Sequence, residues 1–133
     1  MAETGKAVLV VEDESAIALN LKHTLSSLGY LSATASSGPQ ALQVAETLHP
    51  QIVIMDLRLR GGVDGIDAAA QLRGRHGAFA LIYSTGGSVD GDWKFRAMQT
   101  SPDAWLAKPY TLDQLKAALS LAESRLSRQS DVR

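Results

Sequence analysis

Reactive side chains stand directly after several of the apolar segments in this sequence. They include carboxylates, a hydroxyl and an ammonium group, which together can bind a metal ion and a phosphoryl group. In chain order these residues are Glu12, Asp13, Glu14, Asp56, Thr85 and Lys108. Carboxylates that lie close together repel one another unless a cation lies between them. Because this set contains no Cys or His, the predicted ion is a hard one, and Mg²⁺ is the expected ion.

The stretch IVIMDLRLRGG, residues 52–62, predicts the nucleophile of this chemistry. Four apolar residues indicate a buried strand that runs straight into Asp56, so the strand would hold this carboxylate at the rim of the core. A carboxylate beside Mg²⁺ can attack a phosphoryl group and form an aspartyl phosphate. Lys108 and the metal would neutralise the phosphoryl oxygens, and the Thr85 hydroxyl would donate a hydrogen bond to one of them.

Each of these residues also has a purely structural explanation. Acids such as Asp13 and Glu14 stabilise the first turn of a helix, and a lone Asp after a strand commonly caps a helix or a turn. Thr85 precedes two glycines, as turn residues do, and Lys108 followed by Pro109 is typical of a loop. We favour the chemical explanation because all these groups are predicted to meet at one end of one sheet.

The elements that would position these groups alternate between strand and helix. Apolar segments predict buried strands at residues 7–11, 30–35, 51–55, 79–83 and 104–107. Helical patterns follow at residues 17–28, 37–49, 66–72, 90–99 and 111–126. Gln40 and Gln114 stand three residues after Ser37 and Thr111, which is the spacing of a capping box. The alternation predicts an α/β fold with a doubly wound, five-stranded parallel sheet, whose active crevice lies at the carboxyl ends of the strands.

Composition narrows the class of protein. The chain has 133 residues, a formal net charge of −1 and no cysteine, which fits one domain without disulfides, thiolate chemistry or Cys-bound zinc. The near-neutral charge gives no reason to expect nucleic-acid binding. The sequence has no apolar run of membrane-spanning length and lacks the basic start of a signal peptide. We therefore expect a cytoplasmic protein that binds neither membranes nor nucleic acids.

Five motifs, taken in order, resemble the receiver domain of two-component response regulators. They are VLVVEDE, IVIMDL, DGIDAA, IYSTGG and WLAKPY, and the resemblance covers about residues 7–122. It implies a flavodoxin-like (CheY-like) fold with strand order 2-1-3-4-5. We expect one receiver domain at residues 1–126, followed by a polar C-terminal tail at residues 127–133.

The resemblance gives the acidic residues individual roles. Asp56 matches the family's phosphoacceptor and one of its metal ligands. Asp13 matches the direct Mg²⁺ ligand, and Glu12 matches an acid that binds the metal through water. Arg58 stands where the family supplies a backbone carbonyl to the metal. The implied magnesium site therefore consists of Glu12, Asp13, Asp56 and Arg58.

Three residues beyond this acidic group also match family positions. Thr85 matches the switch hydroxyl and Lys108 matches the catalytic lysine, so the implied catalytic set is Asp56, Thr85 and Lys108. The peptide bond between Lys108 and Pro109 is expected to be cis. Trp105 stands where the family often carries an aromatic residue that rotates as part of the switch. The structural alternative for Trp105 is a residue of the core.

Three features depart from the family pattern. The loop after Asp56 is one residue longer than usual, and Arg60 replaces a frequent proline. Arg58 and Gly87 occupy two positions that tune the lifetime of the phosphoryl group in the family, so the sequence leaves that lifetime open. The stretch IYSTGG also resembles a motif of stand-alone regulators in alphaproteobacterial stress signalling, from which Ser84 and Ser88 depart.

We expect a single-domain response regulator. A histidine kinase or histidine phosphotransfer protein would donate the phosphoryl group to Asp56. Output would be a phosphorylation-dependent contact with an unidentified protein, through the face formed by helix 4, strand 5 and helix 5. The chain would catalyse only its own phosphorylation and dephosphorylation, without an external substrate. It would be a monomer, or a dimer that forms on phosphorylation.

Other functions use the same residues differently. The chain could be a phosphate shuttle or sink in a multistep phosphorelay, or a receiver-like module that signals without phosphate. A phosphohydrolase with an Asp nucleophile usually needs a second acid two residues later, where Arg58 stands. The stretch TGKA resembles the end of a P-loop, but it precedes the first strand and lacks the Ser or Thr that should follow the lysine.

Overall fold

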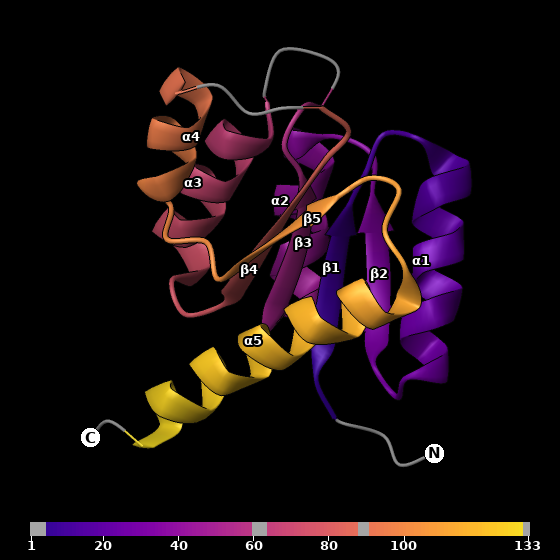
Figure 1. Ribbon diagram of the computed structural model, residues 1–133. Helices are drawn as coiled ribbons and strands as arrows, with labels where there is room; N and C mark the ends of the chain where they lie inside the picture. Colours follow the sequence, from indigo (N-terminus) through magenta and orange to yellow (C-terminus); the bar gives the residue numbers. More distant parts are fainter. Residues whose placement is uncertain (1–4, 60–63, 88–90, 132–133) are drawn as a thin grey trace.

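The computed structural model describes residues 5–59, 64–87 and 91–131, and within these ranges strand and helix alternate five times (Figure 1). The strands are β1 (Ala7–Val11), β2 (Leu31–Ala35), β3 (Ile52–Asp56), β4 (Ala80–Thr85) and β5 (Ala104–Ala107). The helices are α1 (Ser15–Ser27), α2 (Gly38–Leu48), α3 (Gly65–His76), α4 (Gly91–Met98) and α5 (Leu112–Asp131). The predicted alternation is confirmed.

All five strands form one parallel sheet in the order β2-β1-β3-β4-β5. This confirms the predicted doubly wound α/β fold and its strand order. The register pairs Asp56 with Ser84 and Thr85 with Ala107, so β3, β4 and β5 end close to one another along the sheet. Side chains that follow these strands therefore meet at one edge.

Alternate residues of the central strands face two separate hydrophobic clusters, one on each side of the sheet. On one side, Leu9, Val53 and Leu81 pack with residues of α2 and α3. On the other side, Val8 and Ile54 pack with residues of α1 and α5. Every residue of β1 and β3 is buried, which explains why these strands read as continuous apolar runs without alternation.

Side-chain caps fix where three of the helices begin. The Thr111 N–H donates to Gln114 Oε1 at 2.8 Å, and the Gln114 N–H donates to Thr111 Oγ1 at 3.1 Å, so the predicted capping box before α5 is confirmed. Before α2, the Gln40 N–H donates to Ser37 Oγ, while Gln40 Oε1 accepts from the preceding Ser36 N–H. The Asp64 carboxylate caps α3 by accepting from the Asp67 N–H.

Two helices extend beyond their predicted limits. Helix α3 runs to His76, four residues past the predicted end, and closes with Gly77 at a φ of 65°. Helix α5 runs to Asp131, so the predicted tail from residue 127 is helical as far as Asp131. The apolar pattern of this helix stops at Leu126. The helical backbone continues beyond it because residues 112–131 contain no Gly or Pro that would end a helix. Among the described residues, no helix is long and apolar enough to cross a membrane.

Helix α5 is held at the amino-terminal edge of the sheet by charged contacts. Glu123 accepts from the Tyr30 hydroxyl at 2.7 Å and pairs with Lys6 at 3.0 Å. Arg125 pairs with Asp103 at 2.7 Å. These contacts fix the second half of α5 against the starts of β1, β2 and β5. The first half of α5 lies beside α1 (Figure 1).

Candidate functional site

The carboxyl ends of four strands gather the predicted site residues at one edge of the sheet. Glu12 and Asp13 follow β1, Asp56 is the last residue of β3, Thr85 is the last residue of β4, and Lys108 follows β5. The strands hold these residues firmly because their apolar positions are fixed in the core. The bond between Lys108 and Pro109 is cis, as predicted.

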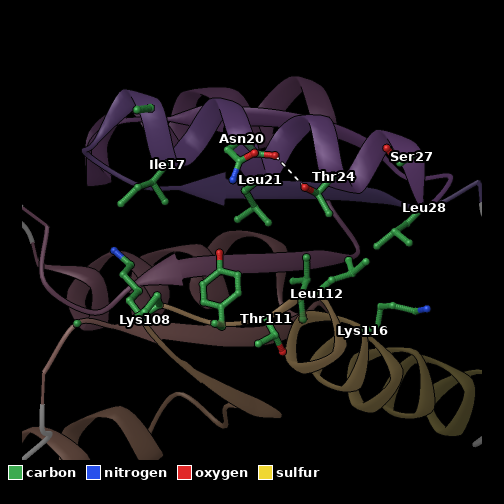
Figure 2. A pocket seen from close by; sticks show the side chains of 15 residues that line it. Ile17, Asn20, Leu21, Thr24, Ser27, Leu28, Lys108, Thr111, Leu112 and Lys116 are labelled. Atoms are coloured by element: carbon green, nitrogen blue, oxygen red, sulfur yellow. Dashed lines mark hydrogen bonds between the residues drawn. The ribbon is translucent and has the colours of Figure 1, made fainter.

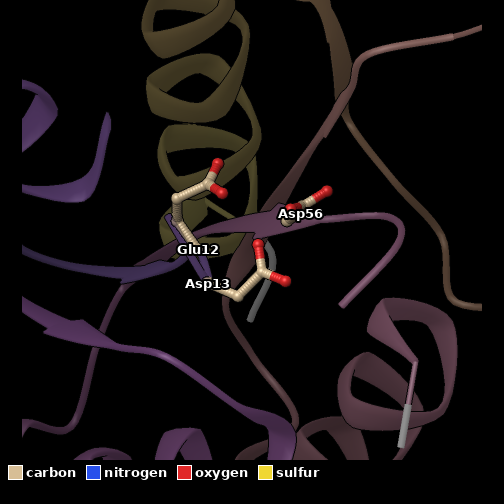
Figure 3. A group of neighbouring side chains, drawn as sticks. All are labelled: Glu12, Asp13 and Asp56. Atoms are coloured by element: carbon tan, nitrogen blue, oxygen red, sulfur yellow. The ribbon is translucent and has the colours of Figure 1, made fainter. Parts of the chain in front are cut away.

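Three carboxylates form the acidic part of the site. One oxygen each from Glu12, Asp13 and Asp56 lies within 4.8 Å of the other two (Figure 3). Glu12 and Asp56 are buried, at 4% and 6% exposure, and Asp13 is half-buried. The Glu14 N–H donates to Glu12 Oε2, which fixes one side of that carboxylate. This buried negative charge needs a cation or a proton close by.

Lys108 supplies positive charge to this acidic cluster. Its Nζ lies 2.6 Å from Glu12 Oε1 and 3.5 Å from Asp56 Oδ2. Burial by itself lowers the pKa of the Lys108 ammonium, but the hydrogen bond to Glu12 and the negative charge of Asp56 outweigh it, so the net effect is a raised pKa. The lysine is therefore firmly charged, and Glu12 is its nearer partner.

The Asp56 carboxyl has a raised pKa. Burial raises the pKa of its carboxyl from 3.8 to about 6, and the nearby charge of Glu12 adds to the rise. The Arg58 N–H, which donates to Asp56 Oδ1 at 3.1 Å, and the Lys108 charge oppose it. Burial therefore disfavours the ionised Asp56 carboxylate, and a cation bound next to it would stabilise this charged form.

The Thr85 side chain faces the loop that follows β4. Its hydroxyl donates to the Gly87 carbonyl at 3.0 Å and accepts from the Gly87 N–H at 3.3 Å. The Lys108 N–H donates to the Thr85 carbonyl at 2.8 Å, so the backbones that carry these two residues are joined directly.

Trp105 is half-buried on β5, where it packs against the hydrophobic cluster below α2 and α3. It pairs with Tyr83 across the strands, and the two ring centroids are 5.3 Å apart. The Tyr83 hydroxyl in turn lies 2.6 Å from Thr100 Oγ1, at the end of α4. Tyr83 and Thr85 are on the same face of β4. The structure therefore connects the predicted switch residue both with β4 and with α4.

The loop after Asp56 is anchored at both ends. The Leu57 N–H donates to the Ser84 carbonyl at 2.8 Å, and the Gly65 N–H donates to the Leu57 carbonyl at 3.2 Å. A Cβ on Gly65 would lie 2.0 Å from the Asp56 carbonyl oxygen, so only glycine allows α3 to begin there. Gly65 is the second residue of the motif DGIDAA, and no local pattern in the sequence indicates this close approach. Arg60 and the glycine pair that follows it lie outside the described residues.

The donor set fits a magnesium ion. Mg²⁺ prefers hard oxygen ligands at about 2.0–2.1 Å and usually keeps several waters, so one or two direct carboxylates are enough. Because Lys108 holds Glu12 at 2.6 Å, Asp13 and Asp56 are the carboxylates better placed for direct binding. The Arg58 backbone already turns toward Asp56 through its N–H.

A groove of about 970 Å³ lies beside the site, between α1 and the start of α5 (Figure 2). Its walls are largely apolar, with Leu21 of α1 facing Leu112 of α5. Lys108 lines one end of it, so the groove leads directly to the acidic cluster.

Comparison with known proteins agrees with this geometry. The family model of the response regulator receiver domain matches residues 8–120. The alkaline phosphatase synthesis transcriptional regulatory protein PhoP of Bacillus subtilis is 33% identical over 113 residues, which cover 85% of this chain and 46% of that protein. The transcriptional regulatory protein PdtaR of Mycobacterium tuberculosis is 33% identical over 125 residues, covering 93% of this chain and 60% of that protein. The chain thus spans about half the length of these relatives.

Solved structures agree as well. The receiver domain of a modulated diguanylate cyclase from Desulfovibrio desulfuricans G20 has a TM-score of 0.82 and 32% identity, covering 92% of this chain and 98% of that one. The receiver domain of a putative Luxo repressor protein from Vibrio parahaemolyticus has a TM-score of 0.83 and 26% identity, with coverages of 96% and 97%. Motifs, fold and site geometry lead to the same result: the chain belongs to the response regulator receiver domain family.

Proposed function

We propose that this chain accepts a phosphoryl group on Asp56 and signals through a protein contact that depends on it. The observation that carries the proposal is the shared cation: the Lys108 ammonium lies 2.6 Å from Glu12 and 3.5 Å from Asp56, inside a cluster of three carboxylates. A structural salt bridge needs one acid, whereas a phosphoryl site needs a nucleophile, metal ligands and a cation together.

The transfer would come from a phosphohistidine, since response regulators interact with histidine kinases and phosphotransfer proteins. An Asp56 oxygen attacks phosphorus, the P–N bond breaks, and its electron pair returns to the imidazole nitrogen, which then takes up a proton. Lys108 would bind one phosphoryl oxygen, and Thr85 would leave the Gly87 carbonyl to donate to another. Asp13 and Asp56, with Glu12 through water and the Arg58 carbonyl, would hold Mg²⁺, which supplies charge neutralisation.

Output would follow from the movement of Thr85. Because the Thr85 carbonyl accepts from the Lys108 N–H and Tyr83 packs on Trp105, a shift at the end of β4 reaches β5. The partner surface that we propose is the face of α4, β5 and α5. Exposed apolar side chains on its two helices, Met98 and Leu121, support this choice, since binding would bury them.

Intact mass measurement tests the proposal directly. The protein is incubated with acetyl phosphate or phosphoramidate and Mg²⁺, and the expected result is the gain of one phosphoryl group. Asp56→Asn should gain none, and Asp113→Asn, which removes an exposed acid at the start of α5, should behave as the unchanged protein. Absence of labelling, or labelling that survives Asp56→Asn, would contradict the proposal. Transfer from the labelled protein to a histidine phosphotransfer protein would identify a shuttle instead of an output regulator.

A further inference from the structure

Two guanidinium groups lie over one indole ring on α4. The Arg58 Cζ lies 5.3 Å from the centroid of the Trp93 ring, and the Arg96 Cζ lies 5.4 Å from the same centroid. Arg96 is held in addition by Asp64 and Asp67, at 3.4 and 3.2 Å. The Trp93 ring thus contacts the loop after β3 through Arg58. Its neighbour on the same helix, Arg96, pairs α4 with the start of α3 through Asp64 and Asp67.

Arg58 connects this ring with the acidic cluster. Its backbone N–H donates to Asp56 Oδ1, while its side chain is exposed and reaches Trp93. The two ends of one residue therefore contact the proposed phosphoryl acceptor and α4. This link differs from the path through Thr85 and Trp105, because it leaves from the loop after β3 and does not pass through β4 or β5.

We propose that Trp93 is a positioning residue for Arg58, which it holds on α4 while Asp56 is unmodified and gives up when Asp56 carries a phosphoryl group. This inference rests on the proposed function. A phosphoryl group adds negative charge and three strong acceptor oxygens beside the Arg58 backbone, and a guanidinium binds such oxygens better than it binds a ring face. Transfer of Arg58 would release its contact between α4 and the loop after β3, and would leave the pairing of Arg96 with Asp64 and Asp67 in place.

The contact with the ring opposes the transfer by a modest amount. A cation on an aromatic face at an exposed site is worth about a two- to fivefold change in an equilibrium constant. Removing the ring should therefore make Arg58 more available and tighten the binding of a phosphoryl mimic by that factor. The tighter binding of the mimic should occur only when Arg58 is present. This requirement distinguishes a role of Trp93 in positioning Arg58 from a general effect of Trp93 on folding.

A double-mutant cycle tests the inference with beryllium trifluoride in the presence of Mg²⁺ as the phosphoryl mimic. We expect Trp93→Leu to tighten its binding about two- to fivefold, Arg58→Ala to weaken it, and Trp93→Leu to have no effect in the Arg58→Ala background. Trp93→Phe should lie between the two, because phenylalanine keeps a weaker ring. Phe95→Leu, an exposed aromatic on the same helix, should leave binding unchanged.

A fluorescence measurement keeps the test independent of affinity. In a Trp105→Phe background, the emission of Trp93 should change when beryllium trifluoride binds, and this change should disappear with Arg58→Ala. Equal effects of Trp93→Leu in both backgrounds, or weaker binding by Trp93→Leu, would overturn the inference while the proposed function stands. If the unchanged protein fails to bind the mimic, or if Asp56→Asn still binds it, the proposed function itself fails.

Discussion

The Lys108 ammonium lies 2.6 Å from Glu12 Oε1, although the two residues are 96 positions apart in the chain. One follows the central strand β1 and the other follows the edge strand β5, so the ion pair crosses the carboxyl edge of the sheet. Lys108 thereby pairs with Glu12, so Asp13 and Asp56 are the carboxylates that we propose as direct ligands of a metal ion.

Replacing Lys108 by methionine should slow phosphorylation by a small phosphodonor about 100-fold, because one donor to the transferring phosphoryl group is lost. Rates are measured by intact mass at fixed Mg²⁺ and acetyl phosphate. Lys116→Met, which removes an exposed lysine of α5, is the matched control and should leave the rate unchanged. Equal rates for both variants would show that Lys108 serves the fold alone.

Asp56→Asn should stabilise the metal-free protein at pH 7. The pKa of Asp56 is raised to about 6 in the fold by burial, so the folded state binds a proton between pH 4 and 6 that the unfolded chain has already lost. Stability therefore falls as pH rises through this window, and the ionised carboxylate costs about 3 kcal/mol above it. Urea unfolding with a chelator present should give that advantage for the variant at pH 7 and almost none at pH 4. A difference independent of pH would contradict the assignment.

Loss of a metal-binding carboxylate should weaken Mg²⁺ binding unequally. We expect Asp13→Asn to lower the affinity about 10- to 100-fold. Glu12→Gln should lower it less, because Glu12 is already paired with Lys108. Calorimetric titration measures both. Glu46→Gln removes an exposed acid of α2 that pairs with Arg75 of α3. This variant should not change the affinity for Mg²⁺. The site would be assigned wrongly if Asp13→Asn matched this control.

Gly65→Ala should destabilise the fold by about 1–3 kcal/mol, because its Cβ would overlap the Asp56 carbonyl oxygen at 2.0 Å and something must shift. Gly74→Ala, in the same helix and with open space around its Cβ, should instead stabilise the protein by about 0.5–1 kcal/mol. Chemical denaturation compares the two. Equal effects would mean that the start of α3 adjusts freely.

Much of the architecture could be predicted because each central strand is buried on both faces. Such strands appear in the sequence as short apolar runs, so β1 was predicted with its observed limits. The edge strand β5 is only partly buried, but its four residues are all apolar, and its limits were also predicted as observed. The residues after these runs, Asp56 and Lys108 among them, then had to meet at the carboxyl edge. The capping box before α5 and the Ser37 cap of α2 were also readable, since their hydrogen bonds depend on a fixed spacing along the chain.

Contacts that depend on the path of a loop could not be predicted. The stacking of Arg58 on Trp93 joins residues 35 positions apart from a loop and a helix, and neither composition nor periodicity records it. The role of Gly65 depends on how closely α3 approaches β3, which no local pattern encodes. The end of α5 was missed for another reason: a helix whose last turns leave the core keeps its hydrogen bonds but loses its apolar stripe.

The hydrogen bond from Gly65 to the Leu57 carbonyl closes the segment between these residues into a ring whose two ends are fixed to the sheet. Leu57 is fully buried and its N–H is bonded to Ser84, so the backbone that directly follows Asp56 is attached to the sheet at its first residue. Arg58, inside the ring, contacts the carboxylate through its own N–H. The position of Asp56 therefore depends on backbone hydrogen bonds and not on the side chains that the ring carries. We expect side-chain substitutions within the ring to change the surface that a partner meets and to leave the carboxylate in place.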